Sequence, residues 1–191
     1  MSENNPDTDG WREATLLVRG GTIRSEHRET SEGLYLTSGY VYGSAEEAEA
    51  SFSNKLERYV YSRYANPTLT MLEDRLRLIE GAEACRTTAS GMAAVYAALV
   101  CQLKAGGRVV AARALFGSCL YILQEILPRF GVDVELVDGI DLDQWAAALS
   151  RPTDVVLVES PSNPTLEIVD LPAIAELAHA AFEQEVVIEQ P

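Results

Sequence analysis

The second half of this 191-residue chain alternates short apolar runs with segments of helical spacing. The runs RVVAA, VDVELVD and DVVLVES are rich in β-branched residues, and each is followed by a helical pattern. Strands that alternate with helices form parallel sheets, because a parallel pair needs a crossover connection. Residues 155–158 are apolar throughout, which predicts a strand buried on both faces. The sequence therefore predicts an α/β fold with a mostly parallel sheet.

The first part of the chain has a different pattern. Residues 1–50 contain few periodic runs and many small or polar residues, including the pair Gly20 and Gly21. We expect an extended N-terminal arm here. Such an arm cannot bury both of its faces alone, so it lies on another surface of the same protein or of a partner subunit.

Two helices are predicted between this arm and the first strand. Pro67 stands near the start of a segment with apolar residues at helical spacing, and Gly81 ends that segment. Ser90 and Gly91 then introduce the Ala-rich stretch MAAVYAALVCQL, which is apolar nearly all round. This stretch predicts a buried helix that ends near Gly106.

The composition excludes several classes of protein. Asp and Glu number 29 against 15 Lys and Arg, a formal net charge of -14, which disfavours nucleic acid and anionic membranes as partners. No run approaches the roughly 18 apolar residues of a membrane span, and the N-terminus lacks the apolar region of a signal peptide. Three cysteines without CxxC spacing indicate neither a disulfide framework nor a zinc site, and a reducing cytoplasm is expected. Cys101 and Cys119 occupy apolar helical positions and are expected in the core.

Candidate binding residues lie near the strand ends, where ligands gather in open α/β sheets. Ser90 and Gly91 stand at a helix start, where unpaired N–H groups can hold a phosphate; simple helix capping is the alternative. Tyr61 and Arg63 in YVYSRYANPT offer a hydroxyl and a guanidinium suited to phosphate oxygens. The alternative for this pair is a surface Arg beside aromatic packing.

Two further loops follow strands directly. Phe116 in ALFGS is placed to stack on a planar ring, with a role in the core as the alternative. Glu159 and Asn163 occupy the Pro-bracketed turn ESPSNPT, where polar side chains need partners; a structural turn is the simpler alternative. Neither GxGxxG after a strand nor GxxxxGK[ST] nor GxSxG occurs, so dinucleotide, nucleoside-triphosphate and hydrolase sites lose their main support.

The segments YSRYANPT, ASGMAA, LFGS and ESPSNPTLEIVDL, in this order, resemble the Cys/Met-metabolism family of pyridoxal-phosphate (PLP) enzymes. The resemblance covers residues from about 14 to 181 and is strongest to the O-succinylhomoserine sulfhydrylases of that family. It implies the large domain of the aspartate-aminotransferase type and pyridoxal 5'-phosphate as the cofactor. It also implies replacement of the ester of a homoserine substrate by sulfide, which gives homocysteine for methionine biosynthesis.

The same resemblance implies a role for each matching residue. Gly91 and Met92 would donate backbone N–H groups to the PLP phosphate. Tyr61 and Arg63 would reach that phosphate in a neighbouring subunit, so the protein would be a homo-oligomer, a dimer or a tetramer, with its site at an interface.

Three other residues match the ring-binding part of the family's site. Phe116 takes the place where many relatives have a Tyr stacked on the pyridine ring. Asn163 would lie near the cofactor's phenolic oxygen, with the carboxylate of Glu159 close behind it. The predicted cofactor-binding residues are Tyr61, Arg63, Ser90, Gly91, Met92, Phe116, Glu159 and Asn163.

The chain departs from the family after its last predicted helix. Glu189 stands where relatives have the Asp that holds the pyridine nitrogen, and the two lysines, Lys55 and Lys104, are best explained as surface residues. We therefore expect no Schiff-base Lys and no C-terminal small domain, and residues 51–191 would be an incomplete, truncated PLP-binding domain. Two alternatives stay open. One is a non-catalytic module that forms a mixed oligomer with a full-length relative, and the other is a cystathionine γ-synthase or γ-lyase of the same family.

Overall fold

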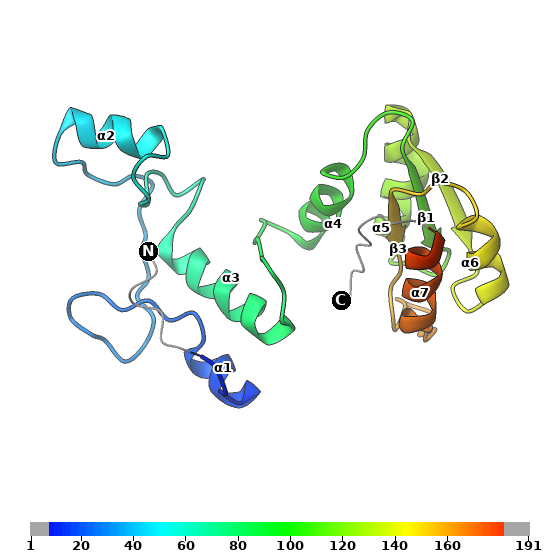
Figure 1. Ribbon diagram of the computed structural model, residues 1–191, viewed down its shortest axis with the longest axis horizontal. Coiled ribbons are helices and arrows are strands. Elements are labelled where there is room, and N and C mark those ends of the chain that lie inside the picture. The colour runs from blue at the N-terminus through cyan, green and yellow to red at the C-terminus, as the bar shows by residue number, and fades with distance from the viewer. Residues whose placement is uncertain (1–7, 182–191) are drawn as a thin grey trace. The chain divides into compact units, whose positions relative to one another are not determined.

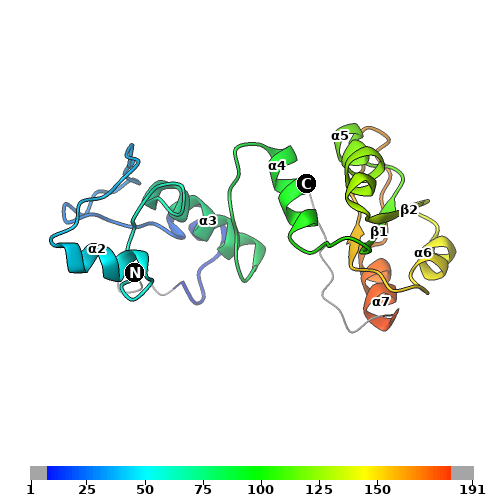
Figure 2. The same ribbon diagram turned by 90° about the horizontal axis from the view of Figure 1, so that it is seen from above.

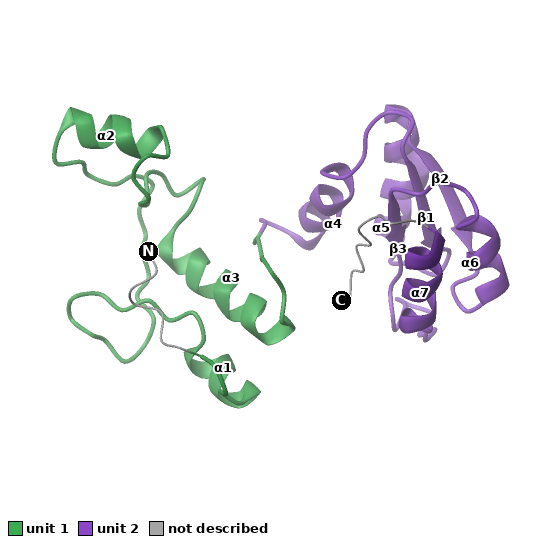
Figure 3. Ribbon diagram, in the orientation of Figure 1, with its two compact units in different colours: residues 1–87 green, residues 88–191 purple. Residues whose placement is uncertain are grey.

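The computed structural model describes residues 8–181, which belong to two compact units (Figures 1 and 3). One unit ends at Thr87 and the other begins at Thr88. The predicted boundary at residue 50 therefore differs from the observed division, because the helix after Pro67 belongs to the first unit. Glu189 lies outside the described residues.

The second unit is built on one parallel sheet. Its strands are β1 (Arg108–Ala112), β2 (Asp133–Val137) and β3 (Val155–Leu157), in the order β2-β1-β3. Both neighbouring pairs are parallel, with Ala111 opposite Leu136 on one side and Leu157 on the other. The predicted strand order along the chain and the parallel pairing are confirmed.

Alternate side chains of these strands enter two apolar layers on opposite faces of the sheet. The first apolar layer contains Val109 and Leu157 and is completed by α4 (Gly91–Val100), α5 (Gly117–Tyr121) and η1 (Ile122–Ile126). The second apolar layer contains Val110 and is completed by α6 (Leu142–Ala148) and α7 (Leu171–Ala181). Figure 2 shows α5 and α7 on opposite sides of the strands. A sheet covered on both faces explains the continuous apolar strands of the sequence.

The first unit contains α1 (Glu13–Arg19), α2 (Ala45–Phe52) and α3 (Pro67–Glu80). The helix predicted after Asn66 is confirmed, with Asn66 as its cap and Gly81 in the left-handed region at φ 62°. The Gly20 and Gly21 pair packs directly on α3. A Cβ atom on Gly21, at φ +69°, would lie 2.9 Å from the Met71 carbonyl oxygen, so this contact requires glycine.

The expectation of an extended arm over residues 1–50 is wrong where helices interrupt it. The short helix α1 has no side-chain cap and packs against α3, so tertiary contact rather than local sequence supports it. The helix α2 begins at Ala45, after Ser44, whose hydroxyl accepts the N–H of Glu47 at 3.1 Å.

Two predicted helices also differ from expectation. The helix α4 ends at Val100 rather than near Gly106. The segment after β1 begins as α5 but continues as the π-helix η1 and then the 3₁₀ helix η2 (Leu127–Phe130), because Pro128 cannot donate the hydrogen bond of a regular helix.

The two cysteines expected in the core have different environments. Cys101 is exposed at the end of α4, so that expectation is wrong. Cys119 is half-buried and packs against the first apolar layer. Within residues 8–181, no helix has the length and apolar character that crossing a membrane requires.

Candidate functional site

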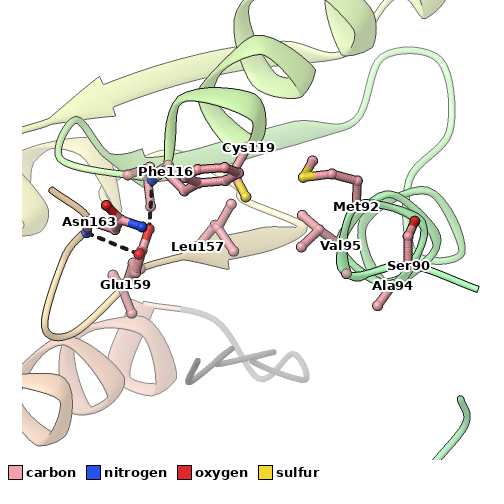
Figure 4. A pocket seen from close by; sticks show the side chains of 12 residues that line it. Ser90, Met92, Ala94, Val95, Phe116, Cys119, Leu157, Glu159 and Asn163 are labelled. Atoms are coloured by element: carbon pink, nitrogen blue, oxygen red, sulfur yellow. Dashed lines mark hydrogen bonds between the residues drawn. The ribbon is translucent and has the colours of Figure 1, made fainter. Parts of the chain in front are cut away.

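A cavity of about 520 Å³ lies within the second unit, at the carboxyl ends of β1 and β3 (Figure 4). Its walls come from the start of α4, from the loop that leads from β1 into α5, and from the turn after β3. Because β1 and β3 are parallel neighbours, the loops after them emerge at the same edge of the sheet. Six of the eight predicted cofactor-binding residues line the cavity: Ser90, Gly91, Met92, Phe116, Glu159 and Asn163.

The start of α4 offers unpaired hydrogen-bond donors to this cavity. The Ser90 hydroxyl accepts the N–H of Ala93 at 3.2 Å, so the capping expected of Ser90 is present. The N–H groups of Gly91 and Met92 have no acceptor within the described part of the chain. Space is also open beside Gly91, where an added Cβ atom would meet nothing within 4 Å. Two free donors at the positive end of a ten-residue helix suit an anionic group such as phosphate.

The opposite wall presents an aromatic face. Phe116 precedes α5, its side chain is 44% exposed, and Figure 4 shows its ring near Cys119 and Leu157. Phe116 is therefore not a core residue, which was the alternative interpretation. Leu157 and Val95 add apolar surface to the cavity. An apolar slot with a partly exposed ring suits a planar aromatic ligand.

Glu159 links two walls of the cavity. Its carboxylate accepts the backbone N–H of Phe116 at 2.7 Å through Oε2 and the backbone N–H of Asn163 at 3.0 Å through Oε1 (Figure 4). Each oxygen of the carboxylate therefore has one backbone donor.

The turn that carries Asn163 is held by two serines, Ser160 and Ser162, that no motif in the sequence marks. The hydroxyl of the buried Ser162 accepts the N–H of Glu167 at 3.0 Å. The hydroxyl of Ser160 accepts the N–H of Val169 at 3.2 Å. The expected structural turn is thus present, while the Asn163 side chain is exposed at the cavity.

The remaining two predicted residues, Tyr61 and Arg63, belong to the first unit, which is described by itself. The Arg63 guanidinium lies 4.8 Å from the ring centroid of Tyr61 and 5.5 Å from that of Tyr64. Arg63 and both tyrosines are exposed, and the described residues provide no carboxylate partner for Arg63. The arrangement matches the predicted surface Arg beside aromatic rings and leaves the guanidinium available to an anion.

Neither lysine of the sequence belongs to the cavity of the second unit. Lys55 is exposed in the first unit. Lys104 is exposed in the second unit, after the end of α4, and does not line the cavity. Both placements agree with their interpretation as surface residues.

Comparison with known proteins gives consistent matches. A family model described as Cys/Met metabolism PLP-dependent enzyme matches residues 14–190. The O-succinylhomoserine sulfhydrylase of Mycobacterium tuberculosis is 60% identical over 173 residues, 91% of this chain and 43% of the relative. The O-succinylhomoserine sulfhydrylase of Pseudomonas aeruginosa is 41% identical over 174 residues, with the same coverage of 91% and 43%.

Solved structures show the same relationship. A crystal structure of a protein described as an O-acetylhomoserine (thiol)-lyase from Campylobacter jejuni, which contains pyridoxyl-lysine monophosphate, matches with a TM-score of 0.86 and 27% identity. The match covers 94% of this chain and 44% of that one. The predicted large-domain fold of PLP-dependent enzymes is confirmed. The chain spans about 43% of the length of the curated relatives it matches.

Proposed function

This chain belongs to the Cys/Met-metabolism family of PLP-dependent enzymes, and we propose that its cavity holds the phosphate and the ring of PLP. The observation that carries the proposal is the meeting of six predicted residues around one cavity. The two unpaired N–H groups of α4 provide donors for the phosphate, and the exposed ring of Phe116 provides a face for the pyridine.

The residues of this site would bind and orient the cofactor rather than react with it. PLP, when bound, supplies an electron sink for the amino-acid substrate. Gly91 and Met92 would hold the phosphate through backbone N–H groups, and the Asn163 side chain would lie near the phenolic oxygen. Phe116 has no hydroxyl, so it would stack on the ring without moving a proton.

For the whole protein to which these residues correspond, we propose O-succinylhomoserine sulfhydrylase activity. In this reaction sulfide replaces the succinate ester on the γ-carbon, which gives homocysteine and free succinate. The two curated sulfhydrylases, at 60% and 41% identity, support this assignment. No feature of the described residues favours a cystathionine γ-synthase or γ-lyase instead.

A single N–H donor tests the cofactor site. Proline is tolerated at the first position of a helix and replaces the N–H with a ring CH₂ group, and Ser90 already has the extended backbone that a following Pro requires. We expect Gly91→Pro to weaken PLP binding about 10- to 100-fold, since a hydrogen bond to a charged group contributes about 1.5–3 kcal/mol. Equilibrium dialysis against PLP measures the dissociation constant.

Ala45→Pro is the matched control. Ala45 is the first residue of α2, in the first unit, and follows Ser44, which also has extended backbone. This variant should bind PLP as the wild-type chain does. Absence of saturable binding to the wild-type chain, or equal dissociation constants for Gly91→Pro and the wild type, would overturn the proposed site.

We also propose that these 191 residues do not catalyse the reaction alone, because Lys55 and Lys104 are both exposed and Lys104 does not line the cavity. The test is borohydride reduction with one equivalent of PLP, which fixes the cofactor on a lysine amine where such a bond exists. Mass spectrometry should then find no stoichiometric adduct, only partial labelling shared among the exposed amines. A stoichiometric adduct that disappears in Lys55→Arg or Lys104→Arg would contradict this part of the proposal.

We propose that the first unit associates with a partner subunit, either a second copy or a full-length relative. Large apolar side chains of this unit are exposed, including Leu36 at 94% and Val41 at 90%, and covering them with a partner would remove their apolar surface from water. Tyr61 and Arg63 would then serve the phosphate of the partner's site. Sedimentation velocity should show association that Leu36→Asp with Val41→Asp abolishes. A monomer at all concentrations, alone and with the relative, would contradict it.

A further inference from the structure

We infer that Glu159 is a positioning residue that holds two walls of the cavity at a fixed separation, one carrying Phe116 and the other Asn163. The inference rests on the proposed PLP site and deepens it. Glu159 was predicted among the residues that bind the cofactor, but both of its carboxylate oxygens are used by backbone donors of the chain itself. Its role is therefore to act through Phe116 and Asn163.

The two hydrogen bonds of Glu159 differ in what they connect. The bond to Asn163 spans four residues and closes the turn after β3. The bond to Phe116 spans 43 residues and joins this turn to the loop after β1. Between residues 113–118 and 158–165, the described structure contains no other hydrogen bond. The Glu159 carboxylate is thus the polar link between the two loops within the described chain.

Strand pairing does not hold the two loops at a fixed separation beside the cavity. The register of β1 with β3 runs from Val109 opposite Val155 to Ala111 opposite Leu157. Beyond that point the segments after β1 and β3 leave the sheet as loops, and the hydrogen bonds between the strands no longer set the distance between them. The distance between a stacking ring and its cofactor must be fixed closely, because an extra gap of 0.5–1 Å loses about a quarter to a half of the van der Waals attraction.

The chemistry of the link requires a carboxylate of this length. Two backbone N–H donors need two acceptors, and a carboxylate is the side chain that offers two oxygens and no donor. Glutamine has the same shape but only one acceptor, and its NH₂ group would face one of the N–H groups. Aspartate is shorter by one methylene, so it cannot reach both loops without a shift of the backbone.

Amide exchange measured without PLP tests the link itself. In Glu159→Gln, hydrogen exchange at the Phe116 or Asn163 amide should accelerate about tenfold, in line with the loss of one hydrogen bond. Glu176→Gln, which removes the same charge from an exposed site on α7, should leave both amides unchanged. Unchanged exchange at both amides in Glu159→Gln would overturn the inference.

PLP affinity then tests whether the link acts on the cofactor through Phe116. We expect Glu159→Gln to weaken PLP binding about 5- to 10-fold and to have a smaller effect in the Phe116→Ala background, because residues that act together are not additive. If Glu159→Gln raises the PLP dissociation constant by the same factor with and without Phe116→Ala, Glu159 does not act through the ring, and the inference would be overturned. A purely structural role would instead lower the free energy of unfolding, and the changes in PLP binding free energy of the two variants would simply add.

Two provisions keep the outcomes separate. If the wild-type chain binds no PLP, the proposed cofactor site fails, while the exchange measurement still decides whether Glu159 links the loops. If Glu159→Gln does not fold, the wild-type chain offers a direct measurement, the scalar coupling across the hydrogen bond between the Phe116 nitrogen and the Glu159 carboxyl carbon. A coupling is expected, and its absence would overturn the inference.

Discussion

The two units of this chain are held together in different ways. In the second unit, buried apolar residues fill both faces of the sheet. In the first unit, Met71 and Pro67 are the only apolar side chains that are buried among those described. Polar side chains hold that unit instead: Arg75 pairs with Glu32 and donates to the Gly20 carbonyl at 2.9 Å, and Asn66 donates to the Tyr35 carbonyl at 2.9 Å.

This difference shows which part of the chain can organise a site by itself. Apolar burial is the dominant favourable term in folding, whereas a hydrogen bond contributes a net 0.5–1.5 kcal/mol or so. The second unit has a core, and its cavity is built at the edge of that core. The first unit has hydrogen bonds without a core, which is consistent with its proposed need for a partner surface. Substitutions should therefore act globally in the second unit and locally in the first.

The largest effect is expected from Trp145→Ala. The Trp145 side chain is fully buried in the second apolar layer, and its indole N–H donates to the Gly139 carbonyl at 3.0 Å. Removing it leaves a large cavity, so the free energy of unfolding should fall by about 3–5 kcal/mol. Urea denaturation followed by far-UV circular dichroism measures the change. Glu57→Ala, at an exposed site of the first unit, should change it by less than about 0.5 kcal/mol, and similar values for both variants would contradict the comparison.

The fold of the second unit could be predicted because its signals are local. The apolar runs, the helical periods between them and the order of both are visible in the sequence. The burial of Arg108 was not predictable from the run RVVAA. Its guanidinium donates to the Ala148 carbonyl and pairs with the carboxylates of Asp133 and Glu135, while its buried Nε has no hydrogen-bond acceptor among the described residues. No local pattern in the sequence brings these partners together.

The candidate site was predictable to a similar degree. Phe116, Glu159 and Asn163 follow strands directly, and Ser90 begins a helix, so parallel-sheet geometry alone brings them to one edge. The link from Glu159 to Phe116 was not foreseen, because a bond across 43 residues depends on the pairing of β1 with β3. The apolar lining residues carry no signal in the sequence that distinguishes them from core residues.

One missed element in the first unit was readable. Ser44 and Glu47 have the spacing of a capping box, with the Ser44 hydroxyl accepting the N–H of Glu47 at 3.1 Å. The Glu47 carboxylate in turn accepts the N–H of Gly43 at 2.6 Å. This motif predicts the start of α2, which an extended arm does not contain.

A smaller, local effect is expected from Asn66→Ala in the first unit. The buried Asn66 side chain caps α3 by accepting the Thr68 N–H at 2.9 Å and donates to the Tyr35 carbonyl. The Asn66 amide also donates to the Ser62 hydroxyl at 3.0 Å. Loss of the cap and of these two further bonds should lower the free energy of unfolding by about 2–3 kcal/mol. Amide exchange should accelerate at Thr68 and Tyr35 while residues of α4 keep their protection.

Ser44→Ala is the matched control for Asn66→Ala. It removes the cap of α2 and the hydrogen bond between the Ser44 hydroxyl and the exposed Glu46 carboxylate, both in the first turn of α2. The free energy of unfolding should therefore fall by about 0.5–1 kcal/mol, with the loss of amide protection confined to α2. Equal loss of protection in α4 after Asn66→Ala would show that the two units unfold together, which contradicts the comparison.

The smallest effect concerns acid titration of a turn in the first unit. The Glu29 carboxylate accepts the Ser25 N–H at 2.9 Å and the Ser25 hydroxyl at 2.7 Å. The Ser25 N–H, the largest cause, and then its hydroxyl lower the pKa of Glu29 from 4.5 to about 2. Because the folded pKa is depressed, the stabilisation of the turn is complete above pH 4.5 and is lost as the pH falls through about 2.

Carboxyl ¹³C NMR tests this titration. Glu29 should titrate near pH 2, and Ser25→Ala should raise its midpoint part of the way toward 4.5, because the Ser25 N–H remains. Asp141 is the control in the second unit, where hydrogen bonds from Gln144 lower the pKa of its carboxyl, and Ser25→Ala should leave it unchanged. A Glu29 midpoint near 4.5 in the wild type would contradict the proposed turn. If the pKa values of Glu29 and Asp141 are both lowered, local hydrogen bonds act similarly in the two units. The difference between the units then lies in apolar burial.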